Sequence, residues 1–338
     1  MLNELKLWSK KLKDGADIAH NFHFENSAKL SKQITKIAFF GMGGSGISGR
    51  IIKTFLDKKT NIPSFIVDGS EIPNFIDGNT LAIVVSYSGN TWETVENLKI
   101  LANKFIPTVV MTHGGQAAEL AEKNNIPFAI LPDSLQPRFS LGNCLGFILT
   151  LFSLMEILPE GRDILDLFIK NSEIFIPKLE DESFFKDFLD LAEKKDYFYL
   201  WGVAQDSESF AYRAQTQFNE NSKVPVVSST FPELAHNLLV GFSDCNNNPL
   251  VVLFYSEFLK AHLEIAIDSM CQIIKEKGVE LYKPPIFGDT WESQLFNMIL
   301  WSDFASYFLG KRRNVDTVNV KIIEDLKAKY QQKQKNMK

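Results

Sequence analysis

Short runs of apolar residues, separated by stretches long enough for a helix, recur through the first half of the chain. Runs of this kind are found at residues 36–40, 64–67, 81–85, 108–111 and 128–131. Consecutive apolar residues are typical of strands that are buried on both faces, as in a parallel sheet. Residues 47–56 have the apolar spacing of a helix, and residues 141–158 are predicted to form a buried helix. The pattern therefore predicts an α/β first domain over residues 1–158, with a doubly wound parallel sheet flanked by helices.

The second half of the chain carries a weaker copy of the same pattern. Residues 159–195 mix charged residues with Leu, Ile and Phe and are predicted to form a helical connection. A second α/β domain is then predicted over residues 196–338, with a helical segment at 207–219 and strands at 197–201, 223–227 and 249–254. This copy lacks the glycine and serine clusters that follow two strands of the first domain, so it indicates a duplication whose second half has changed its role.

A glycine-rich segment, Gly41-Met-Gly-Gly-Ser-Gly46, links a predicted strand to a predicted helix. Glycines at such a turn allow a phosphate to approach the backbone closely, and the N–H groups of the helix start attract anions. The spacing fits the dinucleotide pattern G-x-G-x-x-G, and Asp68 lies about 20 residues on, where a ribose-binding carboxylate would belong. Taken alone, the segment allows a nicotinamide-dependent dehydrogenase or another phosphate-binding protein.

A second loop favours a phosphate ester over a dinucleotide. Ser86-Tyr-Ser-Gly-Asn-Thr91 also follows an apolar strand and precedes a helix. Its hydroxyls exceed the single hydroxyl that a helix cap requires. Hydroxyls and backbone N–H groups without lysine form a neutral cradle that suits a phosphate monoester. The two loops together predict a phosphate-binding site at Gly43, Gly44, Ser45, Ser86, Ser88 and Thr91.

The two loops resemble the signature of sugar isomerase (SIS) domains, and other motifs resemble those of the bifunctional phosphoglucose/phosphomannose isomerases. These motifs are Gln136-Pro-Arg138, Phe218-Asn-Glu-Asn221, Pro232-Glu-Leu-Ala-His-Asn237 and Ile323-Glu-Asp-Leu-Lys327. The resemblance implies two SIS-type, flavodoxin-like domains. It also implies cofactor-independent isomerisation of glucose 6-phosphate, mannose 6-phosphate or both to fructose 6-phosphate. Trp92 and Phe139-Ser140 differ from the residues expected of the family at these positions, so the preferred substrate stays open.

Aldose–ketose isomerisation moves a proton between C1 and C2 through an enediolate. A carboxylate base, an acid–base group for ring opening and a cation near the enediolate oxygens suffice, without a metal. The resemblance implies four roles: Glu220 as the base, His236 as the ring-opening group, Arg138 as the cation and Lys327 as an aid to proton transfer at the sugar hydroxyls. The residues alone also allow a solvated Glu220, an ordinary surface His236 and a structural salt bridge at Arg138. Glu233 is expected to act as a structural cap rather than as a second base.

Composition and charge limit the classes of partner and the cellular compartment that are expected for this chain. The chain has 338 residues, a formal net charge of −5 and mostly dispersed basic residues, which argues against a nucleic-acid partner. The first 14 residues lack the apolar run of a signal peptide, and the apolar stretch at 145–158 is too interrupted for a membrane span. Neither the five histidines nor Cys144, Cys245 and Cys271 have metal-ligand spacing, so we expect no metal site and a reducing, cytoplasmic location.

The resemblance further implies a homodimer in which each active site takes His236 from the neighbouring subunit. Phe-rich segments at 296–301 and 304–309 carry more large apolar groups than one helix face needs. They would therefore cover a partner surface or fill the core of the second domain. Two other functions stay open. A sugar-phosphate-binding regulator would use the same loops, although the N-terminal segment is a poor candidate for a DNA-binding module. A dehydrogenase is disfavoured by the serine-rich loop.

Overall fold

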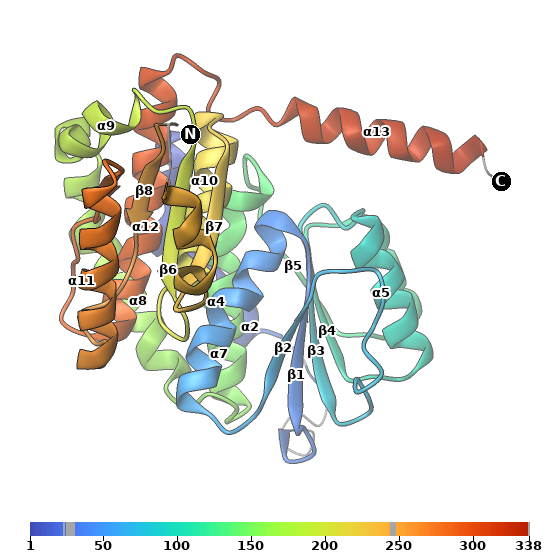
Figure 1. The fold of residues 1–338 in the computed structure, drawn as a ribbon. Coiled ribbons are helices and arrows are strands. Elements are labelled where there is room, and N and C mark those ends of the chain that lie inside the picture. Colours follow the sequence, from blue (N-terminus) through green and yellow to red (C-terminus); the bar gives the residue numbers. More distant parts are fainter. Residues whose placement is uncertain (23, 25–30, 244–247, 337–338) are drawn as a thin grey trace.

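The computed structural model describes residues 1–22, 24, 31–243 and 248–336, and it contains two parallel β-sheets with helices between them (Figure 1). The first sheet has the strand order β2-β1-β3-β4-β5, and all its strand pairs are parallel. Its strands are β1 (Lys36–Phe40), β2 (Ser64–Val67), β3 (Thr80–Ser86), β4 (Thr108–Thr112) and β5 (Phe128–Ile130). The order is that of a flavodoxin-like sheet. The predicted first sheet is confirmed.

Alternate residues of the central strands face opposite helical layers, because side chains of a strand point alternately to its two faces. On one face, Ala38 and Phe40 pack with apolar residues of α5 (Trp92–Asn103) and α6 (Gly115–Lys123). On the other face, Ile37 and Phe39 join a larger cluster with α4 (Gly43–Lys59) and α7 (Leu141–Leu154). Burial on both faces explains why these strands are almost wholly apolar.

The second sheet has four parallel strands in the order β7-β6-β8-β9. They are β6 (Phe198–Val203), β7 (Val226–Phe231), β8 (Leu250–Leu253) and β9 (Glu280–Tyr282). The strand expected at 223–227 starts only at Val226, because Lys223 has a left-handed φ of 56° and Pro225 has no N–H to donate. The short strand β9 was not predicted, since three residues with a leading glutamate carry little periodic signal.

One apolar cluster fills the space between the two sheets and joins them. The helices that contribute to it are α1 (Leu2–Leu5), α2 (Trp8–His20), α4, α7, α8 (Gly161–Leu179), α9 (Lys186–Ala192), α10 (Glu208–Gln217) and α12 (Trp291–Arg312). A third cluster lies between the outer face of the second sheet and α11 (Ala261–Glu276). The Phe-rich segments of α12 therefore fill the core, because Phe296, Phe304 and Phe308 are all buried.

One helical stretch within the described residues, Pro137–Leu154, is long and apolar enough to cross a membrane. In the structure 83% of it is buried inside the protein, as expected of a core helix. Cys144 and Cys271 are buried free thiols, and Cys245 lies outside the described residues.

The C-terminal helix α13 (Lys321–Asn336) extends away from the helices of the second domain and lies above the first (Figure 1). Residues 321–330 of this helix are all exposed. Its ring contact to the body is a stack between Tyr330 and Trp92, with ring centroids 5.4 Å apart and planes at 22°. A helix of this kind can reach over the first domain without belonging to its core.

Candidate active site

The two predicted phosphate loops lie at the topological switch point of the first sheet. Strands β1 and β3 are neighbours there, and the crevice outside their carboxyl ends is where open α/β sheets bind ligands. The glycine-rich segment follows β1, and the serine-rich loop follows β3. The Ser45 hydroxyl accepts a hydrogen bond from the Tyr87 N–H at 3.1 Å, which joins the two loops. The structure thus brings the two predicted loops together at one edge of the sheet.

The glycine-rich segment forms the first turn of α4 rather than a separate loop. Gly43 has a φ of +52°, which favours glycine at this position. No side chain caps the helix, so the N–H groups of Gly43 and Gly44 are available to an anion. A Cβ atom on Gly44 would lie 2.9 Å from the backbone nitrogen of Arg138. Glycine at position 44 therefore allows the phosphate loop to contact the turn that carries the predicted catalytic arginine.

The hydroxyls of the serine-rich loop are not used to cap α5. Thr91 is the N-cap residue of this helix, but its side chain makes no cap hydrogen bond. Ser88 accepts only a 3.3 Å bond from the Asn90 N–H, within the loop itself. The Ser86 side chain is buried, and its hydroxyl has no hydrogen-bond partner among the described residues. None of these three hydroxyls is therefore used to cap the helix, and their role in phosphate binding stays a prediction.

Loss of these hydroxyls is expected to weaken binding of every sugar phosphate. Each hydrogen bond to a charged phosphate contributes about 1.5–3 kcal/mol, so the Ser86→Ala/Ser88→Ala double variant should show a higher KM with a smaller effect on kcat. Steady-state kinetics with hexose 6-phosphates would measure the change. Ser269→Ala, on the exposed surface of α11, is the control. An unchanged KM in the double variant would rule out the cradle.

Arg138 lies in the turn η1 (Pro137–Ser140) and is 1% exposed. Its guanidinium donates four hydrogen bonds, to Glu220 Oε2 (3.0 Å), Asn221 Oδ1 (3.0 Å) and the carbonyls of Thr317 (3.1 Å) and Val318 (2.9 Å). Burial lowers the pKa of Arg138, and the adjacent Glu220 opposes this shift. Because a guanidinium has five N–H groups, one N–H of Nη1 makes no hydrogen bond within the described residues.

Glu220 is the solvent-exposed member of the Arg138–Glu220 pair. Its side chain is 23% exposed, whereas that of its partner Arg138 is buried. The helical segment predicted at 207–219 corresponds to α10, and a π-helical turn, η3 (Phe218–Ser222), follows it directly and carries Glu220. Turns of this type are frequent at functional sites. A carboxylate that is held against a cation and open to solvent on one side can accept a proton from a bound ligand.

Asn221 fixes the turn that carries Glu220, a role that sequence reasoning missed. Its amide donates to the Gln217 side chain (3.2 Å) and to the Ser306 hydroxyl (2.9 Å), while its oxygen accepts from Arg138. Asn221 belongs to the same sequence motif as Glu220, and this motif was the signal that could have indicated its role. The carbonyls of Thr317 and Val318 could not have been found, because backbone acceptors carry no residue signature.

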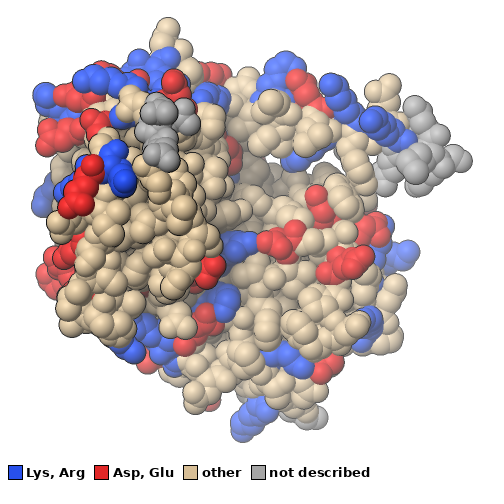
Figure 2. Space-filling view, viewed as in Figure 1, with Lys and Arg blue, Asp and Glu red and all other residues tan. Residues whose placement is uncertain are grey.

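His236 and Lys327 make no hydrogen bond or ion pair with Arg138 or Glu220 within the described part of the chain. His236 lies in η4 (Glu233–His236), is exposed, and has no interaction with either residue in the described part of the chain. Lys327 is exposed on α13, one turn before Tyr330. The Tyr330–Trp92 stack places this part of α13 beside the start of α5, directly after Thr91. Figure 2 shows open space between α13 and the domain below it.

The corresponding switch point of the second sheet, between β6 and β8, is filled by its own side chains. Asp206 accepts hydrogen bonds from the Ser256 N–H (2.9 Å), the Ser256 hydroxyl (2.6 Å) and Trp291 Nε1 (2.8 Å). This buried network leaves no cradle like that of the first sheet, consistent with the changed role inferred from the sequence.

In the first sheet, the Asp68 carboxylate forms an ion pair with Arg50 of α4. The residue expected to bind a ribose in the dehydrogenase alternative is thus already paired.

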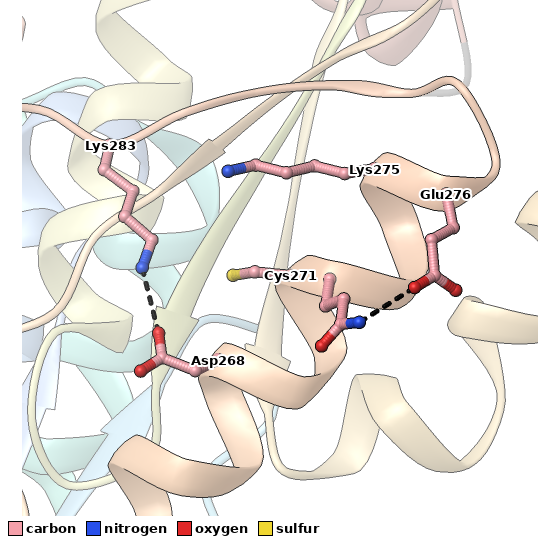
Figure 3. A pocket seen from close by; sticks show the side chains of 6 residues that line it. Asp268, Cys271, Lys275, Glu276 and Lys283 are labelled. Carbon is pink, nitrogen blue, oxygen red and sulfur yellow. Dashed lines mark hydrogen bonds and ion pairs between the residues drawn. The ribbon is translucent and has the colours of Figure 1, made fainter.

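A pocket of about 490 Å³ lies elsewhere, against α11 (Figure 3). Its carboxylates are already engaged, because Asp268 pairs with Lys283 at 3.3 Å and Glu276 accepts from Gln272 at 2.9 Å. Burial raises the pKa of the Cys271 thiol, which makes it a poor nucleophile. The residues that line this pocket do not include any from the two predicted phosphate loops. Within the described ranges, no group of three or more His, Cys, Asp or Glu side chains could hold a metal ion.

Comparison with protein families and solved structures agrees with this architecture. Residues 29–156 match the SIS domain family, and residues 189–329 match the bacterial phospho-glucose isomerase C-terminal SIS domain. The C-terminal domain of glucosamine-fructose-6-phosphate aminotransferase from Francisella tularensis superimposes with a TM-score of 0.71 at 14% identity, covering 94% of this chain and 98% of that one. At this identity the likeness shows a shared fold.

Relatives with higher identity define the family. A bifunctional phosphoglucose/phosphomannose isomerase from Thermoplasma volcanium is 32% identical over 306 residues, covering 90% of this chain and 94% of the relative. A D-glucosamine-6-phosphate 4-epimerase from Sulfolobus acidocaldarius is 27% identical, covering 88% of this chain and 90% of that relative. The higher identity, together with the two SIS domains, confirms the resemblance found in the motifs. The chain belongs to the bifunctional phosphoglucose/phosphomannose isomerase family.

Proposed function

We propose that this protein interconverts glucose 6-phosphate and mannose 6-phosphate with fructose 6-phosphate. The observation that carries the proposal is the 3.0 Å pair between the buried Arg138 and the part-exposed Glu220, next to the phosphate loops. The two aldose phosphates differ only at C2, which becomes planar in the enediolate. Both therefore give the same intermediate, and one base can serve both.

The steps follow from the positions of the groups. The hydroxyls of the serine-rich loop and the N–H groups of the first turn of α4 hold the phosphate. Glu220 removes the proton from C2 of the open-chain aldose and returns it to C1 of the enediolate. Arg138 stabilises the negative charge on the enediolate oxygens, and its remaining N–H donor is available for this. Lys327 assists proton transfer at the sugar hydroxyls.

His236 opens the sugar ring from the neighbouring subunit of a cytoplasmic homodimer. The exposure of His236 and its separation from Glu220 within one chain support this role. Figure 2 shows a broad face of the second domain with few charged side chains. The described part of the second domain exposes large apolar side chains, and a two-fold partner would cover such groups. They include Val227, Val240, Phe258 and Ile265.

Mixing two inactive variants tests whether His236 is shared. If it acts in trans, Glu220→Gln and His236→Ala subunits should regain activity after exchange. Random reassortment gives about half mixed dimers, each with one intact site, because two-fold symmetry pairs every Glu220 with the other chain's His236. Recovery of about a quarter of the wild-type activity is therefore expected. Subunit exchange that is verified by native mass spectrometry but restores no activity would show that each chain builds its own site.

The overall activity is tested by incubating the purified chain with glucose 6-phosphate, mannose 6-phosphate and glucosamine 6-phosphate in separate reactions. Fructose 6-phosphate should form from the first two and can be detected by a coupled enzyme assay. Epimerisation of glucosamine 6-phosphate at C4, with no fructose 6-phosphate from either hexose, would contradict the proposal.

A further inference from the structure

We propose that Arg213, paired with Asp303, is a positioning residue that holds Arg138 in reach of Glu220. The inference rests on the proposed isomerase function and adds a requirement to it. Neither residue touches the predicted phosphate loops, and neither belongs to a motif that carries the family resemblance.

The contacts place Arg213 directly behind the catalytic turn. Arg213, on α10, is 0% exposed, and its Nη2 donates both to Asp303 Oδ1 of α12 (2.9 Å) and to the carbonyl of Arg138 (3.3 Å). Asp303 Oδ2 also accepts from the Trp8 indole N–H at 3.2 Å. The pair therefore connects the backbone of Arg138 to three helices of the central core.

A second buried cation holds the next carbonyl of the same turn. Lys11 of α2 donates from Nζ to the Phe139 carbonyl at 2.8 Å and pairs with Glu4 at 2.6 Å. Consecutive carbonyls of the turn η1 are thus fixed by cations from two different helices. Because backbone and side chain of Arg138 are joined at its Cα, a shift of this turn would displace the guanidinium from Glu220.

The energetics indicate a role beyond packing. An ion pair at this depth loses its hydration, and apolar residues of similar volume often replace such pairs without loss of stability. Burial raises the pKa of Asp303, which reflects this desolvation, and Arg213 opposes the shift. Nε and Nη1 of Arg213 have no acceptor among the described residues, so hydrogen bonds offset the cost only in part. Because this buried pair is costly in free energy and contacts the turn that carries Arg138, we expect its role to be the positioning of that turn.

The inference predicts a particular kinetic signature. Misplacement of a catalytic group by about 1 Å can lower turnover about 100-fold. Substrate binding depends mainly on the phosphate loops, which this pair does not contact. Loss of the pair should therefore lower kcat about 10–100-fold with little change in KM.

The experiment compares Arg213→Met with the double variant Arg213→Met/Asp303→Leu. The single variant leaves a buried carboxylate unpaired and should be destabilised, whereas the double variant removes both charges and should regain thermal stability. The inference predicts that kcat stays about 10–100-fold low in the double variant although its Tm has recovered. Lys195→Met removes another buried cation, which pairs with Glu280 and makes no hydrogen bond to Arg138 or Glu220 in the described residues, and it should lower Tm without lowering kcat.

Recovery of kcat together with Tm in the double variant would overturn the inference, because Arg213 would then act through stability alone. If neither variant folds, Arg213→Lys replaces them. Its ammonium keeps the charge but cannot reproduce the guanidinium geometry, so kcat should still fall, and wild-type kcat in this variant would equally overturn the inference. Failure of the proposed function is distinguishable, since the wild-type protein would then show no isomerase activity.

Discussion

Replacement of Glu220 by glutamine is expected to lower kcat for both aldose phosphates by about 10²–10⁴-fold. Glutamine keeps the shape of the side chain and can still contact Arg138, but it cannot remove a proton from carbon. Phosphate binding should survive, because the serine-rich loop and the start of α4 are unchanged. Steady-state kinetics with glucose 6-phosphate and mannose 6-phosphate, together with thermal unfolding to confirm an intact fold, would measure this effect.

The matched control is Glu173→Gln. Glu173 is a surface carboxylate that contacts Ser9 and Lys13, so this change removes a comparable charge far from the site. Its kcat should equal that of the wild-type protein. If Glu220→Gln retained full activity, the proton would have to be moved by another residue.

Arg138→Lys should lower kcat about 10²–10³-fold, as expected for the loss of a group that stabilises an oxyanion. Lysine keeps the charge but presents a single ammonium in place of the planar guanidinium. The contacts to Asn221 and to the carbonyls of Thr317 and Val318 could not all be kept, so the enediolate and Glu220 would lose their fixed cation. The measurement is kcat for glucose 6-phosphate.

A surface arginine provides the control for replacing arginine by lysine. Arg162→Lys alters an exposed ion pair with Asp166, which should leave kcat unchanged and stability within about 1 kcal/mol. A kcat for Arg138→Lys close to that of Arg162→Lys would mean that the charge at position 138, rather than its hydrogen-bond geometry, is sufficient.

Much of the fold could be predicted because its strands are buried on both faces. Such strands are nearly continuous apolar runs, and the turns after β1 and β3 are marked by glycine and serine clusters. The start of β7 was misplaced because Val224, an apolar residue before Pro225, extends the apparent run. The left-handed backbone at Lys223 cannot be recognised from the pattern of apolar residues, so the pattern could not reveal the later start of the strand.

The candidate site was predictable only where its residues stand in motifs. Ser86, Ser88 and Arg138 follow recognisable local patterns, and the fold brings their elements to one edge of the first sheet. Arg213 and Asp303 are separated by 90 positions and lie within ordinary helices, so their pairing depends wholly on tertiary packing. His236 shows the same limit. Its motif does not indicate where it lies relative to Glu220, because that depends on the arrangement of elements: Glu220 precedes β7, whereas His236 follows it.

The most direct test of the central claim is exchange of the C2 proton with solvent. Wild-type protein incubated with glucose 6-phosphate in tritiated water should incorporate tritium at C1 of the fructose 6-phosphate formed and, through the reverse reaction, at C2 of glucose 6-phosphate. Glu220 carries the proton and can exchange it with solvent before returning it. The account predicts that Glu220→Gln abolishes this incorporation while still binding glucose 6-phosphate. Incorporation at the wild-type rate in Glu220→Gln would contradict the account.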